Sequence, residues 1–142
     1  MPKRKLEDLS WDECFALLGQ ETVGRLVYAD DLGPAAVPVN YAMAGHDIVF
    51  RSDEGSKVQG LQDHGVAFEV DHIDNASRSG WSVLVRGSSE EVEIEHVAEL
   101  LRRIDGSVPL PWKKGLHKIW VVITPKTVTG RRLAGHVFDD FF

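Results

Sequence analysis

Cysteine, long apolar runs and basic charge are all scarce in this sequence. Cys14 is the only cysteine among 142 residues, which excludes an internal disulfide and a metal site built from several thiolates. No run approaches the roughly 18 apolar residues that a membrane-spanning helix needs. The formal net charge of −6 argues against a nucleic acid or an anionic membrane as partner, since both require a sustained basic surface. Any anion that this chain binds must therefore be held by a local cluster of cations.

The N-terminal segment also lacks the apolar part of a secretory signal. The basic residues of MPKRK are followed by the polar and acidic LEDLSWDE. We therefore expect a cytoplasmic protein. With 43% hydrophobic residues the chain can bury a core, and its length predicts a single domain over residues 1–142.

Alternating apolar residues predict a mainly β structure. Gly87 is expected to mark a bulge or bend in the longest strand. The expected strands are TVGRLVYAD, PAAVPVNYAM, DIVFRS, GVAFEVD and WSVLVRGSSEEVEI, with a last pair around HKIWVVITP and TVTGRRL. At least six strands at short spacing favour an antiparallel sheet closed into a small barrel, because closure removes exposed sheet edges.

Short helices are expected at three places. Ser10 and Glu13 fit a capping box, which predicts an N-terminal helix over about residues 10–20. The segment SKVQGLQDH is predicted to form a second helix, and about 95–105 a third. The third has four apolar residues on one face: Val97, Leu100, Leu101 and Ile104.

The two faces of the predicted strands differ in composition. One face is typical of a core: Val37, Val39, Tyr41, Ile48, Phe50, Val66, Phe68, Val70, Trp81, Val83, Val85, Ile119, Val121 and Ile123. The other face mixes small apolar groups, a tryptophan and sparse charges: Pro38, Asn40, Val49, Arg51, Ala67, Glu69, Asp71, Ser82, Leu84, Arg86, Trp120 and Val122. This mixture resembles an interface or the floor of a ligand site. The alternative is a solvated face on which Glu69, Arg51 and Arg86 form cross-strand ion pairs.

The end of the segment VPVNYAMAGHDIVFRSDEGSKV suggests a phosphate site. Arg51, Ser52, Ser56 and Lys57 supply two cations and two hydroxyls, and Gly55 precedes an expected helix start where backbone N–H groups are available. Such a set suits the charge and acceptor oxygens of a phosphate monoester. The alternative is that Ser56 only caps the helix, while neighbouring carboxylates neutralise the two cations.

The order and spacing of several segments are similar to those of a known family. GRLVYADDLGPAAVPVNYAMAGHDIVFRSDEGSKVQGLQDHGVAFEVDHID, GWSVLVRGSSEEV and IWVVITPKTVTGRR together resemble the pyridoxamine 5′-phosphate oxidase-like flavin-binding split-barrel superfamily. Within it, the chain looks most like the small bacterial subgroup that includes nitroimidazole-resistance-type proteins. The resemblance covers about Gly24 to Leu133.

The resemblance implies a six-stranded antiparallel split barrel. It also implies a homodimer with flavin mononucleotide (FMN) at the subunit interface. The residues expected to border the flavin ring through their backbone are Val37, Pro38, Val39 and Asn40. Those expected to meet the phosphate are Arg51, Ser52, Ser56 and Lys57. Trp81 and Ser82 correspond to a further strand that the family brings to the flavin.

The function implied by the resemblance is a flavin-dependent oxidoreductase acting on a small molecule. Two alternatives are an F420-dependent reductase on the same fold and a non-catalytic protein that binds flavin or haem. The true oxidase grips its substrate with a basic and aromatic C-terminal segment, which GRRLAGHVFDDFF does not match, so oxidation of pyridoxamine phosphate is not expected.

The sequence predicts no metal site and assigns no catalytic residue. The six histidines show no HxH or HxxxH pairing of the kind that zinc sites favour. His72 stands out because the carboxylates of Asp71 and Asp74 could orient its imidazole. Nothing resembles a nucleophile elbow.

Overall fold

The computed structural model describes residues 5–53, 65–109 and 118–134. The strands are β1 (Lys5–Asp8), β2 (Val23–Asp30), β3 (Gly33–Ala44), β4 (Asp47–Asp53), β5 (Val66–Asp74), β6 (Ser79–Glu91) and β7 (Lys118–Ala134). The helices are α1 (Trp11–Leu18), the 3-10 turn η1 (Ile94–His96) and α3 (Val97–Arg103). The helix expected at SKVQGLQDH lies outside the described residues. No helix within the described ranges is long and apolar enough to cross a membrane.

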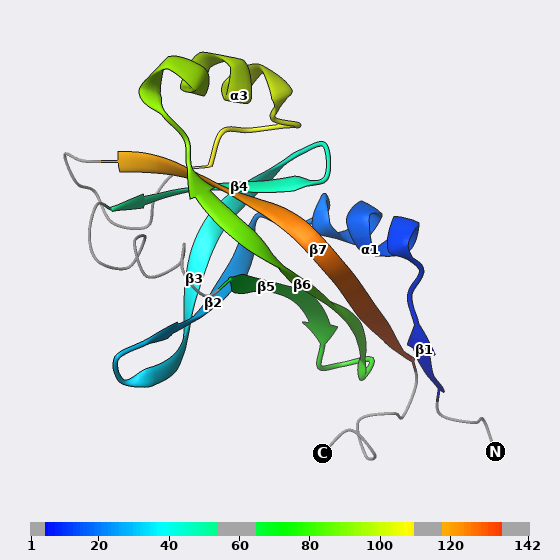
Figure 1. Ribbon diagram of the computed structural model, residues 1–142. Coiled ribbons are helices and arrows are strands. Elements are labelled where there is room, and N and C mark those ends of the chain that lie inside the picture. The colour runs from blue at the N-terminus through cyan, green and yellow to red at the C-terminus, as the bar shows by residue number, and fades with distance from the viewer. Residues whose placement is uncertain (1–4, 54–64, 110–117, 135–142) are drawn as a thin grey trace.

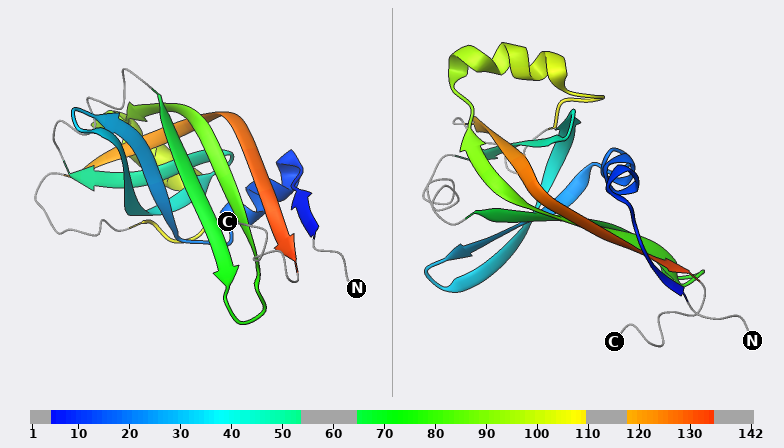
Figure 2. Two further views of the ribbon diagram at one scale, coloured as in Figure 1. Left: turned by 90° about the horizontal axis from the view of Figure 1, so that it is seen from below. Right: turned by 45° about the vertical axis from the view of Figure 1, so that its right-hand side comes forward.

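Six of the strands form a closed antiparallel ring (Figures 1 and 2). The order around the ring is β7, β4, β3, β2, β5 and β6, and β6 pairs again with β7. The short strand β1 lies outside the ring, where it pairs with the C-terminal part of β7. The six-stranded split barrel is therefore confirmed, whereas β1 was not predicted.

The expected last pair of strands is wrong, because β7 is one continuous strand of 17 residues. The segment around Pro125 looked like a turn in the sequence. Instead, Gly87 pairs with Pro125 and Arg86 with Thr127, so Lys126 is the extra residue of a β-bulge. A bulge accommodates a proline without ending the strand. The bulge predicted at Gly87 is confirmed, and its extra residue belongs to the neighbouring strand.

Helix α1 begins with the predicted capping box. The Ser10 N–H donates to Oε1 of Glu13 over 3.0 Å, and the Glu13 N–H donates to Oγ of Ser10 over 3.2 Å. The helix buries Cys14, Leu17 and Leu18 against the barrel core. The Tyr41 hydroxyl donates to the backbone carbonyl of Leu18, which ties the helix end to β3.

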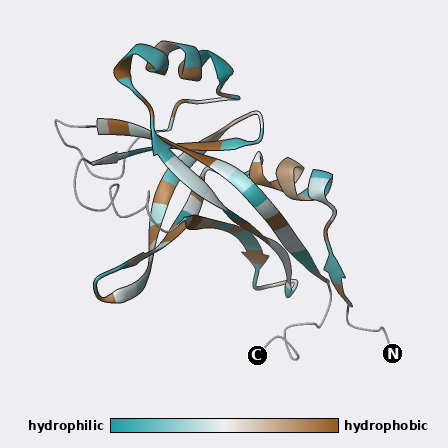
Figure 3. Cartoon of the chain, in the orientation of Figure 1, coloured by the Kyte–Doolittle hydropathy of each residue, from teal (hydrophilic) through white to brown (hydrophobic). Residues whose placement is uncertain are grey.

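The strand face predicted as core lines the inside of the barrel. All its members belong to one buried cluster, with Val37 and Ile119 partly buried at its edge. Figure 3 shows the alternation of hydrophobic and hydrophilic residues along the strands that produces this separation. The core prediction is therefore confirmed.

Helix α3 covers part of the opposite strand face (Figure 1). A second buried cluster consists of Ala44, Val49, Leu100 and Trp120, with Val92, Val97, Ile104 and Val122 packed around it. The apolar residues of β4 and β7 that suggested an interface are thus buried by the chain's own helix. Of the four apolar residues predicted on the helix face, three pack here and Leu101 is exposed.

Candidate functional site

Strand β3 changes its partner between Asn40 and Tyr41, and we call the place where it leaves β4 the opening. Residues Gly33–Asn40 of β3 pair with β2, whereas Tyr41–Ala44 pair with β4. Within the described part of the chain, no ladder pair joins β3 to β4 beyond Tyr41 and Phe50. The predicted ring-edge segment, 37–40, and the predicted phosphate-binding residues of β4 therefore lie on the two sides of this opening.

Every second residue of β3 directs its backbone N–H and C=O groups toward the opening. The Tyr41 N–H donates to the carbonyl of Thr22 over 3.0 Å, on the β2 side. Because hydrogen-bonding direction alternates along an antiparallel strand, Val39 and Val37 also direct their backbone groups toward β2. Pro38 and Asn40 direct theirs toward β4. Proline is tolerated at Pro38 because the N–H that it lacks would not have joined the β2 ladder.

The side chains of the segment 37–40 divide between the two faces. Val39 is buried in the core and Val37 is packed at its edge. Pro38 is exposed and Asn40 half-buried on the outer face. The two valines therefore cannot offer a side chain to a ligand at the opening, and any contact with the segment there is made by its backbone and by the other two residues.

Arg51 has unused hydrogen-bonding capacity beside this opening. Its guanidinium carbon lies 5.0 Å from the centroid of the Trp120 ring, the residue with which Arg51 pairs across β4 and β7. Its Nε atom is buried and, among the residues that the structure describes, has no hydrogen-bond partner. A buried donor without a partner costs free energy unless a ligand or water satisfies it. Ser52 follows it as a buried residue.

The other predicted phosphate ligands, Ser56 and Lys57, lie outside the described residues. Trp81 and Ser82 lie within them, but away from Arg51. Arg51 pairs with Trp120, whereas Trp81 pairs with Arg132, twelve residues further along β7. The Trp81 side chain is buried in the core.

Three side chains form a charged cluster on the outer face of β2 and β5. Nη1 of Arg25 lies 3.2 Å from a carboxylate oxygen of Glu69 and 3.2 Å from one of Asp71. Burial, and then the neighbouring carboxyl of Asp71, raise the pKa of Glu69 to about 7. One alternative drawn from the sequence was that Glu69 forms cross-strand ion pairs with Arg51 or Arg86. Glu69 does form a cross-strand ion pair, but its partner is Arg25.

His72 is held by a different carboxylate from those that flank it in sequence. Its Nδ1 lies 2.8 Å from Oε1 of Glu21, and its side chain is largely exposed. The expected orientation by Asp71 and Asp74 is therefore wrong. Asp71 directly precedes His72 on β5 and points to the opposite face, whereas Glu21, between α1 and β2, lies within hydrogen-bonding distance of the imidazole.

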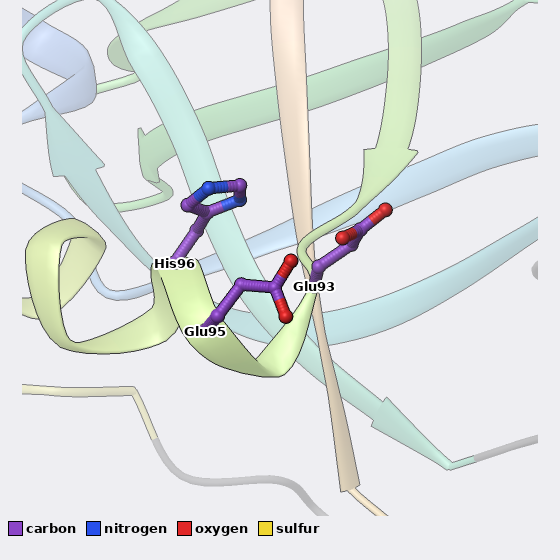
Figure 4. A group of neighbouring side chains, drawn as sticks. All are labelled: Glu93, Glu95 and His96. Carbon is purple, nitrogen blue, oxygen red and sulfur yellow. The ribbon is translucent and has the colours of Figure 1, made fainter.

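A group of possible metal ligands lies at the start of α3. Glu93, Glu95 and His96 bring ligand atoms within 4.8 Å of one another (Figure 4). Their spacing differs from the histidine pairs sought in the sequence. All three side chains are exposed, and exposed acidic groups of this kind are common without an ion.

Comparisons with known proteins place the chain in a family. The family model for pyridoxamine 5′-phosphate oxidase matches residues 10–132. The uncharacterized protein Rv0080 of Mycobacterium tuberculosis is 34% identical over 137 residues, covering 92% of this chain and 87% of that protein.

Two solved structures share the fold. One, described as an FAD-binding protein from Mycobacterium smegmatis, is 32% identical with a TM-score of 0.71, covering 89% of this chain and 97% of that one. The other, an FAD-binding protein from Mesorhizobium loti, is 25% identical with a TM-score of 0.73, covering 93% and 99%. The match over residues 10–132, together with the split barrel, shows that the chain belongs to the pyridoxamine 5′-phosphate oxidase family.

Proposed function

We infer that this protein binds a flavin nucleotide at the opening between β3 and β4. The observation that carries the inference is the buried Nε of Arg51, which has no partner in the described part of the chain. A phosphate oxygen is a strong acceptor that would satisfy this donor with a charge-assisted hydrogen bond. Proteins similar to this chain are described as FAD-binding, which agrees with a flavin as the ligand.

The residues at the opening suit the two ends of FMN. Arg51 and Ser52 would bind the phosphate, and Ser56 and Lys57, which lie outside the described residues, are proposed as further ligands. Trp120 beneath Arg51 would restrict the guanidinium to one position. The backbone groups of Pro38 and Asn40 would face the polar edge of the ring.

The function that follows is that of an oxidoreductase acting on a small molecule. Flavin supplies the electron-transfer chemistry when it is bound. The side chains of this chain would then bind the flavin and the substrate, orient them and exclude water. No single histidine or aspartate is therefore expected to be indispensable for reduction.

The assembly that suits this site is a homodimer with the cofactor at the interface. Trp81 and Ser82 lie on β6, opposite Arg132 and Arg131 of β7. Those positions are too far along β7 from Trp120 for the two residues to join Arg51 within one chain, so a second copy would have to bring them. The exposed Pro38 and the half-buried Leu84 lie on outer-face surface that such a copy could cover. Light scattering at micromolar concentration is expected to find a dimer, and a monomer with tightly bound flavin would exclude a shared site.

The cofactor is identified by what the purified protein retains. FMN, FAD, F420 and haem differ in mass and in absorption spectrum, so mass spectrometry of the released ligand distinguishes them. We expect FMN, with FAD as the alternative that the similar structures favour. Protein that carries none of the four, and binds none on titration, would rule out the proposed function.

A further inference from the structure

A concave surface lies on the outside of the barrel, over β2, β5, β6 and β7. It is a groove of about 430 Å³ lined by Val27, Gly65, Val66, Ala67, Arg86, Gly87, Lys126 and Thr127. Among the described residues that line it, the only charged ones are the two cations, although the chain as a whole carries a net charge of −6.

The register of the sheet brings the polar residues of this groove to one face. Val27 pairs with Ala67, Ala67 with Arg86 and Arg86 with Thr127, so these residues form a row across four strands. Strict alternation would send Lys126 to the opposite face from Thr127. The bulge leaves Lys126 without a ladder partner between Pro125 and Thr127, and Lys126 and Thr127 both line the groove with Arg86. Bulges can re-aim side chains in this way.

Neither cation of the groove has a carboxylate partner among the residues that the structure describes. Within residues 5–53, 65–109 and 118–134, no carboxylate forms an ion pair with Arg86 or Lys126. Arg25, Arg103 and Arg132, in contrast, each lie within 4.0 Å of a carboxylate oxygen. No carboxylate of the described residues therefore competes with an anion for these two cations.

Small residues keep the floor of the groove low. A Cβ at Gly87 would lie 2.1 Å from the Thr124 carbonyl oxygen, so no larger residue fits at the bulge. Gly65 has a φ of +74°, and a Cβ there would approach the carbonyl of Gly87 to 3.3 Å. Ala67, between Val27 and Arg86 in the row, adds only a methyl group. The backbone around the bulge therefore requires glycine at Gly87, and Ala67 leaves the outer face low beside Arg86.

We propose that the groove of Arg86, Lys126 and Thr127 binds the oxyanion of a small molecule, such as a phosphate, at a site separate from Arg51. Two cations and a hydroxyl match the several acceptor oxygens of such a group. The separation follows from the register, since Arg51 pairs with Trp120 and Arg86 with Thr127, seven residues further along β7. At about 3.3 Å per residue, the two positions are roughly 20 Å apart.

The test is a titration of inorganic phosphate into the ¹⁵N-labelled protein followed by NMR, with chloride at equal ionic strength as the reference. We expect saturable shifts of the Lys126 and Thr127 amides. Arg86→Gln combined with Lys126→Gln should weaken phosphate binding by about tenfold or more, because charge-assisted hydrogen bonds are lost. Arg102→Gln removes an exposed cation from α3 and should change nothing. Shifts without saturation, or shifts that persist in the double variant, would overturn the proposal.

A variant that keeps both cations distinguishes an effect on phosphate binding from an effect on folding. Thr127→Val preserves the shape of the side chain and should weaken phosphate binding less than the double variant does. Each variant is checked by its thermal melting curve. If the double variant loses self-association and the wild type shows no saturable phosphate shift, the cations pair with carboxylates of a second copy, and the proposal is wrong.

Repeating the titration with flavin present identifies the source of the oxyanion. If saturating FMN blocks phosphate, the two sites are the same and the separate site is excluded. If FAD blocks phosphate but FMN does not, the groove takes the nucleotide tail of FAD. If neither blocks it, the groove takes a separate small molecule. Because phosphate alone is the probe, the result stands even if the protein fails to bind flavin.

Discussion

Arg25 and Arg51 both lie on the outer face of the barrel, but their surroundings differ. Arg25 is held by two carboxylates, those of Glu69 and Asp71, each 3.2 Å away. Arg51 lies over Trp120, and no residue in the described part of the chain accepts a hydrogen bond from its buried Nε. The charge of Arg25 is paired within the fold, whereas the Nε of Arg51 has no partner among the described residues, which suits the phosphate contact proposed for it. The partners of a cation, more than its position on a strand, separate a structural role from a binding role.

The largest effect is expected from removing the ring beneath Arg51. Trp120 is 8% exposed and packs with Val49 and Leu100, so Trp120→Ala should lower the free energy of unfolding by about 3–5 kcal/mol. Trp11 is 51% exposed, and Trp11→Ala should cost less than half as much. Urea denaturation measures both. Equal losses would mean that α3 does not form a buried cluster with β4 and β7.

A smaller effect is expected from Arg51 itself. Arg51→Gln should weaken FMN binding by roughly ten- to a hundredfold, since a charge-assisted hydrogen bond contributes about 1.5–3 kcal/mol. Riboflavin has the same ring without the phosphate and should bind wild type and variant almost equally. Calorimetric titration of both ligands measures the contrast. Equal weakening of both ligands would point to general damage instead of a lost phosphate contact.

The Lys57 side chain, outside the described residues, provides an independent version of the same experiment. Lys57→Ala should also weaken FMN roughly ten- to a hundredfold and spare riboflavin. Unchanged FMN affinity would show that the GSK segment only starts a helix, as the capping alternative holds.

The carboxylates around Arg25 predict a dependence of stability on pH. The pKa of Glu69 is raised from 4.5 to about 7, so the folded chain binds more protons than the unfolded chain between these values. Protonation of Glu69 therefore contributes to the free energy of unfolding below about pH 4.5, and this contribution is lost as the pH rises through 7. Glu69→Gln should remove this slope and stabilise the protein at pH 8 by on the order of 1 kcal/mol, after allowance for solvent screening. Denaturation curves at pH 5 and 8 test it, with the exposed Glu90→Gln as control. A slope that Glu69→Gln leaves unchanged would assign the proton to another group.

The smallest effect is expected from Arg25. Its ion pairs are partly exposed, so Arg25→Gln should cost less than about 1 kcal/mol and leave FMN affinity within about twofold. Titration and denaturation on the same samples give both values. A loss of FMN affinity as large as that of Arg51→Gln would abolish the distinction between the two arginines.

Alternation along the strands was sufficient to predict the core, because side chains on a strand repeat every two residues. It could not identify neighbours across the sheet. From the sequence, Glu69 was considered as a partner of Arg51 or Arg86. Only the register of the sheet shows that it lies opposite Arg25. Trp120 suggested an interface because the sequence does not show that α3 folds back over β7. The single strand β7 was missed because a bulge, which depends on the partner strand, absorbs Pro125.

The candidate site was predicted in the same uneven way. Charge and hydroxyl groups in the sequence suggested Arg51 and Ser52 as phosphate ligands, and the family resemblance added the segment 37–40; these assignments stay predictions. The opening between β3 and β4 was not predicted, because it depends on where β3 changes partner. The row of Arg86 and Thr127 was missed for the same reason, since these residues are distant in sequence and become neighbours only through the register.

The position of β7 in the ring also affects how the protein folds during synthesis. This strand pairs with β4, β6 and β1, and it begins only at Lys118. Until the ribosome has released that segment, β4 and β6 each lack a neighbour that the finished barrel gives them. The growing chain therefore exposes unpaired strand edges, which promote aggregation, for most of its synthesis. Binding of a chaperone should be strongest on nascent chains that stop just before β7.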